Sequence, residues 1–304
     1  MTQVLSPDGF LDATSSTSWG SQVRVLYRPL GAVVVRRGES NSDYHGCPVT
    51  VSKSGYWCHH SDGAAAFHAR YIARTAPPYE SAALSHGTLL HLWLELGDAF
   101  WQEVVAPPDE LLTATQAIGK EAKAWAAENA PNAQLVSPKE LRQLRAEVRS
   151  IEENRAAAGL IDPDRVADRE LSVRFNIDGF PSRCRPDVLT KDGIVVDLKT
   201  TKETGLYKNW WKAVLNYGYH AQDWLYQRGI EAMGLEPQPL HFIVVSTVPP
   251  HECLVCTLPP SLTSKGGEAI RSSIADIRLR LDLDCWVPDQ HGEVVELPVP
   301  GRAF

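Results

Sequence analysis

Hydrophobic and polar residues alternate strictly between Leu171 and Asp178, the clearest periodic pattern in the chain. A period of two places successive side chains on opposite faces of a strand, so this pattern predicts a β-strand. We expect a turn at residues 179–181, where Gly, Phe and Pro follow one another. Residues 184–189 and 194–198 predict two more short strands on either side of the polar loop 191–193. Together these segments predict an antiparallel meander.

Longer segments predict helices around this meander. Residues 82–96 are apolar on nearly every face, which predicts a buried helix, and Gly97 follows as its stop. Residues 140–149 carry apolar side chains at helical spacing among charged ones, which is typical of a surface helix. The other predicted elements are helices at 55–74 (capped by residues 52–54 and stopped by Pro77 and Pro78), 205–228 and 262–283, and strands at 31–36, 240–248 and 253–258.

The order of these elements predicts an α/β fold with α+β character, in which helices flank a central mixed sheet that includes the meander. We expect the core of the sheet between residues 170 and 258. Residues 1–40 are expected to form an N-terminal extension whose role the pattern does not indicate. One domain is expected to follow, over residues 41–304.

Two acidic residues and a lysine are predicted to converge on one hairpin. Asp197 and Lys199 are two apart in a strand, so their side chains share a face. If residues 191–193 form a three-residue hairpin loop, Asp187 falls directly opposite Asp197. Such loops favour a left-handed residue at the last position, and Gly193 stands there. The turn chemistry therefore selects the register that brings the three side chains together.

Two neighbouring carboxylates repel each other, and a divalent cation resolves this conflict. Oxygen ligands suit Mg²⁺ or Mn²⁺, and a lysine beside such an ion can orient a water molecule or offset charge on a phosphate. The hairpin therefore indicates metal-assisted phosphodiester hydrolysis. The alternative is an ordinary hairpin that carries surface acids and a salt-bridging lysine.

Four other residues could complete such a site. Glu170 could supply a third carboxylate, or could be a surface acid at a strand end. His91 could ligate a metal, or could be a hydrogen-bonded histidine of the core. Gln222 and Tyr226 are four apart and share a helix face, from which they could contact DNA or simply pack in a half-buried helix.

Composition narrows the function classes. The 304 residues carry 37 acidic and 30 basic side chains, a net charge of −7, which excludes a histone-like protein that coats nucleic acid over its whole surface. Six cysteines without dense spacing suit a reducing compartment. The chain shows neither a signal peptide nor an apolar run long enough for a membrane helix, so we expect a cytoplasmic protein without membrane contacts.

Taken in order, these residues resemble the PD-(D/E)XK nucleases of the RecB-like and lambda-exonuclease-like branch, and most of all the RecE (exonuclease VIII) family. The resemblance runs from about Asp43 to the C-terminus. Its motifs are Ser52-Lys-Ser-Gly, Gly87-x-x-x-His91, the Glu170 strand, Arg185-Pro-Asp187, Asp197-Leu-Lys199-Thr-Thr and Tyr219-His-Ala-Gln222-Asp-x-x-Tyr226.

The resemblance implies a restriction-endonuclease-like core and a role for each motif residue. His91, Asp187, Asp197 and the Leu198 carbonyl would bind Mg²⁺, with Mn²⁺ able to substitute. The catalytic set would be Glu170, Asp187, Asp197 and Lys199, in which Glu170 assists at the metal or water and Lys199 positions the nucleophile. Gln222 and Tyr226 would hold the substrate near the scissile phosphate.

The resemblance also implies an activity and partners. Members of the RecE family digest one strand of linear duplex DNA from an end in the 5′→3′ direction. A single-strand annealing recombinase uses the 3′ tail that remains. Relatives form rings around DNA, so we expect a ring-shaped homo-oligomer. Residues 183–212 contain seven basic and four acidic residues, and we assign DNA contacts there to Arg183, Arg185, Lys208 and Lys212. Trp210 and Trp211 could stack on bases or belong to the core.

Three alternatives remain open. Some RecB-like nucleases carry a four-cysteine iron–sulfur cluster, but the spacing of the cysteines here does not fit one, and Cys253 and Cys256 would lie on opposite faces of a strand. A catalytically silent DNA-binding or assembly protein could share the fold, although the intact acid–lysine set argues against it. An endonuclease or a nuclease of 3′→5′ polarity would carry the same motifs.

Overall fold

The computed structural model describes residues 28–76, 82–113, 115, 117–288, 292 and 294–296, with no side chains placed for residues 82–85. Most of the expected N-terminal extension and the expected stop at Pro77 and Pro78 lie outside these residues. Among the helices described, none is long and apolar enough to cross a membrane.

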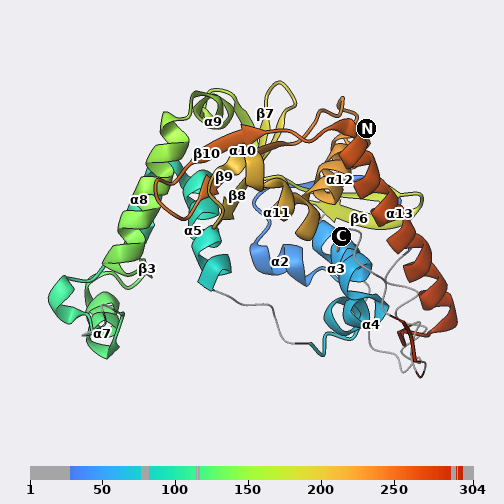
Figure 1. Ribbon diagram of the computed structural model, residues 1–304, viewed down its shortest axis with the longest axis horizontal. Helices are drawn as coiled ribbons and strands as arrows, with labels where there is room; N and C mark the ends of the chain where they lie inside the picture. Colours follow the sequence, from blue (N-terminus) through green and yellow to red (C-terminus); the bar gives the residue numbers. More distant parts are fainter. Residues whose placement is uncertain are drawn as a thin grey trace.

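A five-stranded mixed sheet forms the centre of the molecule (Figure 1). Only β8 and β9 run parallel, and the other neighbouring strands are antiparallel. A parallel pair requires a long crossover, which the helices between β8 and β9 supply. In spatial order the strands are β10 (Cys253–Cys256), β9 (His241–Ser246), β8 (Val195–Thr201), β7 (Val188–Thr190) and β4 (Val166–Arg169).

The predicted meander is antiparallel but is divided between two sheets. Strands β1 (Val34–Arg36), β5 (Ser172–Ile177) and β6 (Phe180–Cys184) form a separate three-stranded sheet. The turn between β5 and β6 consists of Asp178 and Gly179 alone, both with positive φ. The predicted turn was therefore placed too late, because Phe180 and Pro181 already belong to β6.

The alternation in β5 marks a solvent-exposed face only at its end, where Asn176 is exposed. Ser172 and Arg174 are as buried as the hydrophobic residues between them. Arg174 forms an ion pair with Glu39 at 2.5 Å, and this pairing lets a charged side chain lie inside the protein. A polar residue in an alternating strand can therefore lie on a face that other polar groups cover, as well as on a face exposed to water.

Helices cover both faces of the five-stranded sheet, and Figure 1 shows α5 and α8 on one side of it and α12 and α13 on the other. Val196 and Leu198 of β8 pack with α5 (Ala82–Leu96), α8 (Pro138–Glu153) and α9 (Arg155–Ile161). Val195 packs on the opposite side, in a cluster with α3, α12, α13 and the three-stranded sheet. Asp197 and Lys199 share the face of Val195, so they point toward the second group of helices.

The predicted helices are found, but two of them are broken. Residues 55–74 form α3 (Lys53–Asp62), α4 (Ala64–Phe67) and the π-helical turn η1 (His68–Ile72). Residues 205–228 form α10 (Leu206–Asn209), α11 (Trp211–Asn216) and α12 (Tyr219–Ala232). The remaining elements are α2 (Asn41–Gly46), η2 (Gly97–Ala99), α6 (Phe100–Glu103), β2 (Val104–Val105), η3 (Asp109–Leu111), α7 (Lys120–Asn129), β3 (Gln134–Leu135) and α13 (Pro260–Leu283).

The helix α13 packs closely along α12 because two of its residues have no side chain. A Cβ atom at Gly266 would lie 2.3 Å from the backbone oxygen of His220 in α12. A Cβ atom at Gly267 would lie 2.5 Å from the indole nitrogen of Trp224 in the same helix. The depth at which α12 lies in the molecule therefore depends on these two glycines.

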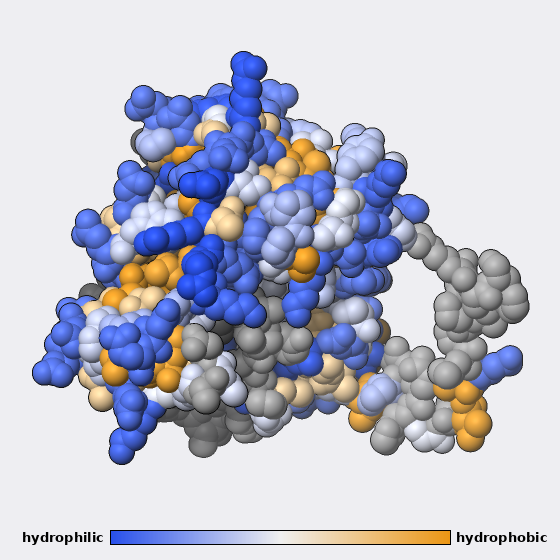
Figure 2. All heavy atoms as spheres, turned by 60° about the vertical axis from the view of Figure 1, so that its left-hand side comes forward, coloured by the Kyte–Doolittle hydropathy of each residue, from blue (hydrophilic) through white to orange (hydrophobic). Residues whose placement is uncertain are grey.

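The helix α8 is a surface helix, as predicted, but it also carries one fully buried charge. Arg142, Arg145 and Arg149 are exposed, and hydrophilic side chains predominate on the face turned forward in Figure 2. Glu147 is 0% exposed and accepts hydrogen bonds from Gln143 and from His86 of α5, each at 2.8 Å. The hydrogen bond from His86 links α8 to α5, the helix that carries His91.

The ion pairs of His86 with Glu140 and Glu147 raise its pKa from 6.5 to about 9. A raised pKa in the folded state stabilises the protein fully below pH 6.5, and the contribution is lost as the pH rises through about 9. We expect the free energy of unfolding to fall by on the order of 2 kcal/mol across this range. Urea unfolding at pH 6 and pH 10 measures it, and an H86Q variant should lose this part of the pH dependence. An unchanged profile in that variant would contradict the assignment.

Candidate active site

The hairpin between β7 and β8 has the predicted register. Val188 pairs with Val196 and Leu189 with Val195, so Asp187 and Asp197 are the next opposed positions. The amide of Thr190 donates to the carbonyl of Ile194 at 2.9 Å and closes the three-residue loop. Gly193 at its last position has a φ of +84°, a conformation that favours glycine.

Asp197 is held by two side chains on the helical side of β8. It is 1% exposed, and its carboxylate forms an ion pair with Lys199. Gln222 of α12 donates a hydrogen bond to the other carboxylate oxygen. The predicted acid–lysine pair is therefore formed, and Gln222 lies beside it and is itself only 3% exposed.

Asp187 lies at the centre of a second group of ligand-type side chains. Its Oδ2 atom accepts a hydrogen bond from the Leu198 amide at 2.7 Å and lies 3.2 Å from Nδ1 of His91. His91, Glu170 and Asp187 each offer one ligand atom, and these atoms lie within 4.8 Å of one another. Arg185 binds Glu170 at 2.8 Å. One residue of α5 and two residues that flank strands thus meet at one point.

Glu170 reaches this point because the chain changes sheets there. It lies between β4 and β5 with a φ of +49°, a left-handed conformation that is uncommon outside glycine. Its amide donates to the carbonyl of Asp187 at 3.1 Å, which holds the two acids side by side. Glu170 is thus at a junction between strands rather than at the start of one.

The electrostatics of the cluster favour a cation. Burial and the negative charge of Asp187 raise the pKa of Glu170 to about 7. Burial also raises the pKa of Asp197, although Lys199 opposes the shift. Burial works in the same direction on Asp187, but His91 and Lys199 outweigh it and lower its pKa. The imidazole of His91 and the carboxylates of Glu170 and Asp187 form a donor set that fits Mg²⁺ or Mn²⁺.

Lys53 lies near Lys199 and was given no role from the sequence beyond its place in the motif Ser52-Lys-Ser-Gly. Lys53, the first residue of α3, has its Nζ atom 5.4 Å from the centre of the Tyr219 ring, and Lys199 lies 5.0 Å from the same ring. Burial and the charge of Lys199 lower the pKa of Lys53 to about 7. A lysine in the first turn of a helix opposes the helix dipole, and this was the available signal.

The predicted DNA-contacting residues differ in their surroundings. Arg183 is buried, donates to the carbonyl of Cys47 at 3.0 Å, and lies with its guanidinium over the Tyr44 ring. Tyr226 is 9% exposed and donates to the carbonyl of Arg185 at 3.1 Å. By contrast, the side chains of Lys208 and Lys212 are exposed. Direct DNA contact by these residues stays a prediction.

The comparisons with known proteins agree with this geometry. Residues 58–289 match the family model described as a PDDEXK-like domain of unknown function (DUF3799). The chain belongs to this family. No curated protein sequence matches the chain.

Solved structures place the PDDEXK-like domain in a known fold. A proposed exonuclease from Eubacterium rectale is 14% identical, with a TM-score of 0.58 over 87% of this chain and 96% of that one. An alkaline exonuclease from Laribacter hongkongensis is also 14% identical, with a TM-score of 0.28 over 60% of this chain and 91% of the other. The first likeness and the family confirm a restriction-endonuclease-like fold of the PD-(D/E)XK superfamily, and the second is too weak to add to it.

Within this PDDEXK-like domain, Cys253 and Cys256 lie on opposite faces of β10. Cys253 packs against the cluster that includes α5 and α8, and Cys256 against the cluster that includes α12. Two thiols separated by the thickness of a sheet cannot bind one iron–sulfur cluster. The geometry therefore favours the interpretation of these two cysteines as structural.

We expect Mn²⁺ to raise the unfolding temperature of the protein, because a bound cation relieves the repulsion among the acids at Asp187. Differential scanning fluorimetry measures the shift, which should be several degrees near saturation. The D187N variant should lose most of it. Asp192 is an exposed acid of the same hairpin, held by Arg165, so D192N should respond like the unchanged protein. Equal shifts in the two variants would contradict a metal site at Asp187.

Proposed function

We propose that this protein is a Mg²⁺-dependent exonuclease that degrades one strand of linear duplex DNA. The observation that carries the proposal is the meeting of His91, Glu170 and Asp187 at one point. The pair of Asp197 and Lys199 lies at the next position of the same hairpin. His91, Asp187, Asp197 and the Leu198 carbonyl would hold the metal. When bound, Mg²⁺ would supply a Lewis acid for the phosphate and lower the pKa of a water molecule.

The chain's own residues orient the substrate and the water. Lys199 is fixed by Asp197 and the Tyr219 ring, so its ammonium group is positioned to donate a hydrogen bond to a phosphate oxygen. Glu170 is fixed by Arg185 and can accept a hydrogen bond from the attacking water. Gln222 holds Asp197 in place. This division of roles follows the resemblance at each motif position.

Replacing Lys199 with alanine should lower the rate of nucleotide release from linear duplex DNA by about 10²–10⁴-fold, because a charge that stabilises the transition state is lost. D197N should lose activity to a similar extent through the loss of a metal ligand. Lys191 is exposed at the tip of the same hairpin and its ammonium group donates to the carbonyl of Asp164, so K191A is the matched control. Release of acid-soluble nucleotides with Mg²⁺ measures all three.

If the unchanged protein and K199A both bind duplex DNA but release no nucleotides, the chain is a catalytically silent DNA-binding protein on the nuclease fold. Circular dichroism of each variant distinguishes a lost function from a lost fold.

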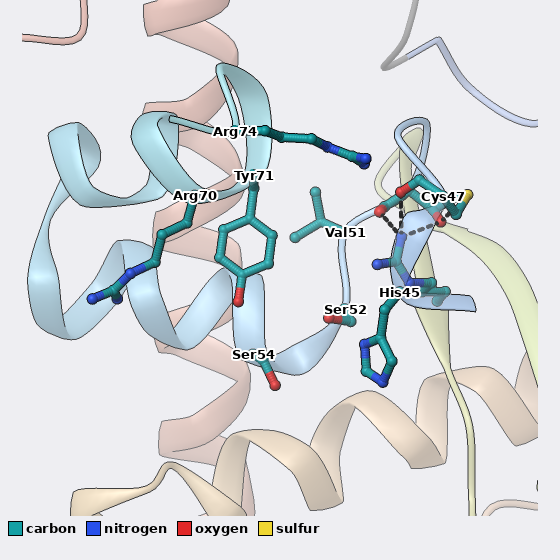
Figure 3. A pocket seen from close by; sticks show the side chains of 10 residues that line it. His45, Cys47, Val51, Ser52, Ser54, Arg70, Tyr71 and Arg74 are labelled. Carbon is teal, nitrogen blue, oxygen red and sulfur yellow. Dashed lines mark hydrogen bonds between the residues drawn. The ribbon is translucent and has the colours of Figure 1, made fainter. Parts of the chain in front are cut away.

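A basic hollow supports digestion from a 5′ end. It measures about 160 Å³ and lies where α3 begins, and Figure 3 shows Arg74 reaching across it while Ser52, Ser54 and His45 lie on the opposite side. Arg183 forms part of its wall, with a buried Nε atom that has no hydrogen-bond partner within the described residues. Hydroxyl groups, arginines and a helix N-terminus suit a terminal phosphate.

We expect a label on the 5′ end to be released before a label on the 3′ end, and closed circular plasmid to remain intact. A 5′-phosphate should be preferred over a 5′-hydroxyl, and R74A should reduce this preference. Arg142 is exposed on α8 and provides the control variant R142A. Earlier release of the 3′ label would establish the opposite polarity and leave metal-dependent hydrolysis intact.

The proposal extends to partners and location. A 3′ single-stranded tail is the substrate of a strand-annealing recombinase, and a ring-shaped homo-oligomer in the cytoplasm would keep the enzyme on its DNA. The net charge of −7 together with a basic segment at residues 183–212 supports an acidic outer surface around a basic channel.

A further inference from the structure

The turn between α11 and α12 displays one aromatic ring on a fixed backbone. Tyr217 is 60% exposed. Its carbonyl accepts a hydrogen bond from Lys53 at 3.0 Å, and the carbonyl of Asn216 accepts one from the Trp57 indole at 3.0 Å. Both donors come from α3. An exposed ring on a tethered backbone loses little conformational freedom when a ligand stacks on it.

Gly218 also fixes the position of this turn, because it packs directly against α3. Its φ is +64°, and a Cβ atom there would lie 2.2 Å from the Trp57 ring. Any other residue would therefore displace either the turn or the indole. The close fit on the inner side of the turn contrasts with the open position of the Tyr217 ring on its outer side.

Tyr217 is one ring away from the acid–lysine site. Its ring centre lies 5.8 Å from that of Tyr219, and the Nζ atom of Lys199 lies 5.0 Å from the Tyr219 ring. Tyr219 in turn stacks on Trp210, which is buried and belongs to the core. The centre of the Tyr217 ring therefore lies no more than about 11 Å from the Lys199 ammonium group, where the proposed nuclease would hold a phosphate.

A basic hollow of about 660 Å³ adjoins the same tyrosine. It is lined by Lys202 just beyond β8, by Lys212 of α11 and by Lys139 at the start of α8. Its two acids are Glu203 and Glu140, and Glu140 already lies 3.5 Å from Nδ1 of His86. The charge is complementary to a phosphate chain, and the volume is that of a site for one or two nucleotides.

We propose that this hollow binds a single-stranded segment of the DNA substrate, with a base stacked on Tyr217 and the backbone beside Lys202 and Lys212. The inference rests on the proposed nuclease function and specifies which form of DNA the site holds. Inside a duplex both faces of a base are covered by its neighbours, so a side chain can stack on a base only in a single strand or at a duplex end. Tyr217 would thereby favour a separated strand over an intact duplex.

Fluorescence anisotropy of the full-length protein with a labelled dT₁₂ strand and with a labelled blunt hairpin duplex tests this. EDTA prevents hydrolysis, so binding is measured apart from catalysis. Y217A should weaken binding of dT₁₂ by at least about five-fold, the effect of losing one base-stacking contact. Y217W should retain it. Tyr207 is 86% exposed and does not line the hollow, so Y207A should bind like the unchanged protein.

The salt dependence of dT₁₂ binding tests the role of Lys202 and Lys212. Each phosphate contact to a single strand contributes about 0.7 to the slope of log K against log salt, so the K202A/K212A double variant should lower the slope by about 1.4. Lys265 of α13 is exposed and does not line the hollow, so K265A should leave the slope unchanged.

Equal losses of dT₁₂ and duplex binding in Y217A, or no binding of dT₁₂ by the unchanged protein, would overturn the inference. Nucleotide release with Mg²⁺, measured on the same preparations, reports the nuclease separately. Release by the unchanged protein without the Y217A effect would refute the single-strand site alone. The Y217A effect without release would refute the nuclease function alone.

Discussion

The register of one short hairpin determines which side chains meet in the candidate active site. Asp187 and Asp197 meet because the loop between their strands has three residues and ends in a glycine with a positive φ. A one-residue slip would turn Asp187 to the other face of the sheet, away from Asp197 and Lys199. The rest of the fold holds this hairpin at the centre of a mixed sheet, where burial strengthens every charge interaction within it.

Because the hairpin lies in a central sheet, helices from both sides complete the site. Helix α5 brings His91 to Asp187, while α12 brings Gln222 to Asp197. The first helix is anchored by the buried pair of His86 and Glu147. The hydrophobic packing on each face of the sheet thus positions one half of a single polar site.

Sequence reasoning recovered those features that depend on local chemistry. The hairpin register follows from turn preferences, and the pairing of Asp197 with Lys199 follows from the two-residue period of a strand. The mixed sheet also followed from element order, but the division of the meander did not, because strand partners depend on contacts between distant segments. Lys53 and Glu147 were missed for a similar reason: each charge has a partner more than fifty residues away in the sequence, the Tyr219 ring for Lys53 and His86 for Glu147.

The glycines of α13 have a consequence for the far side of the molecule. Gly266 and Gly267 lie outside the candidate active site, yet they allow the close packing of α12 on α13. Gln222 lies on that same helix, and a carboxylate is reached or missed over a few tenths of an ångström. One added methyl group at either glycine would therefore push α12 away and separate Gln222 from Asp197, although neither glycine forms part of the hairpin.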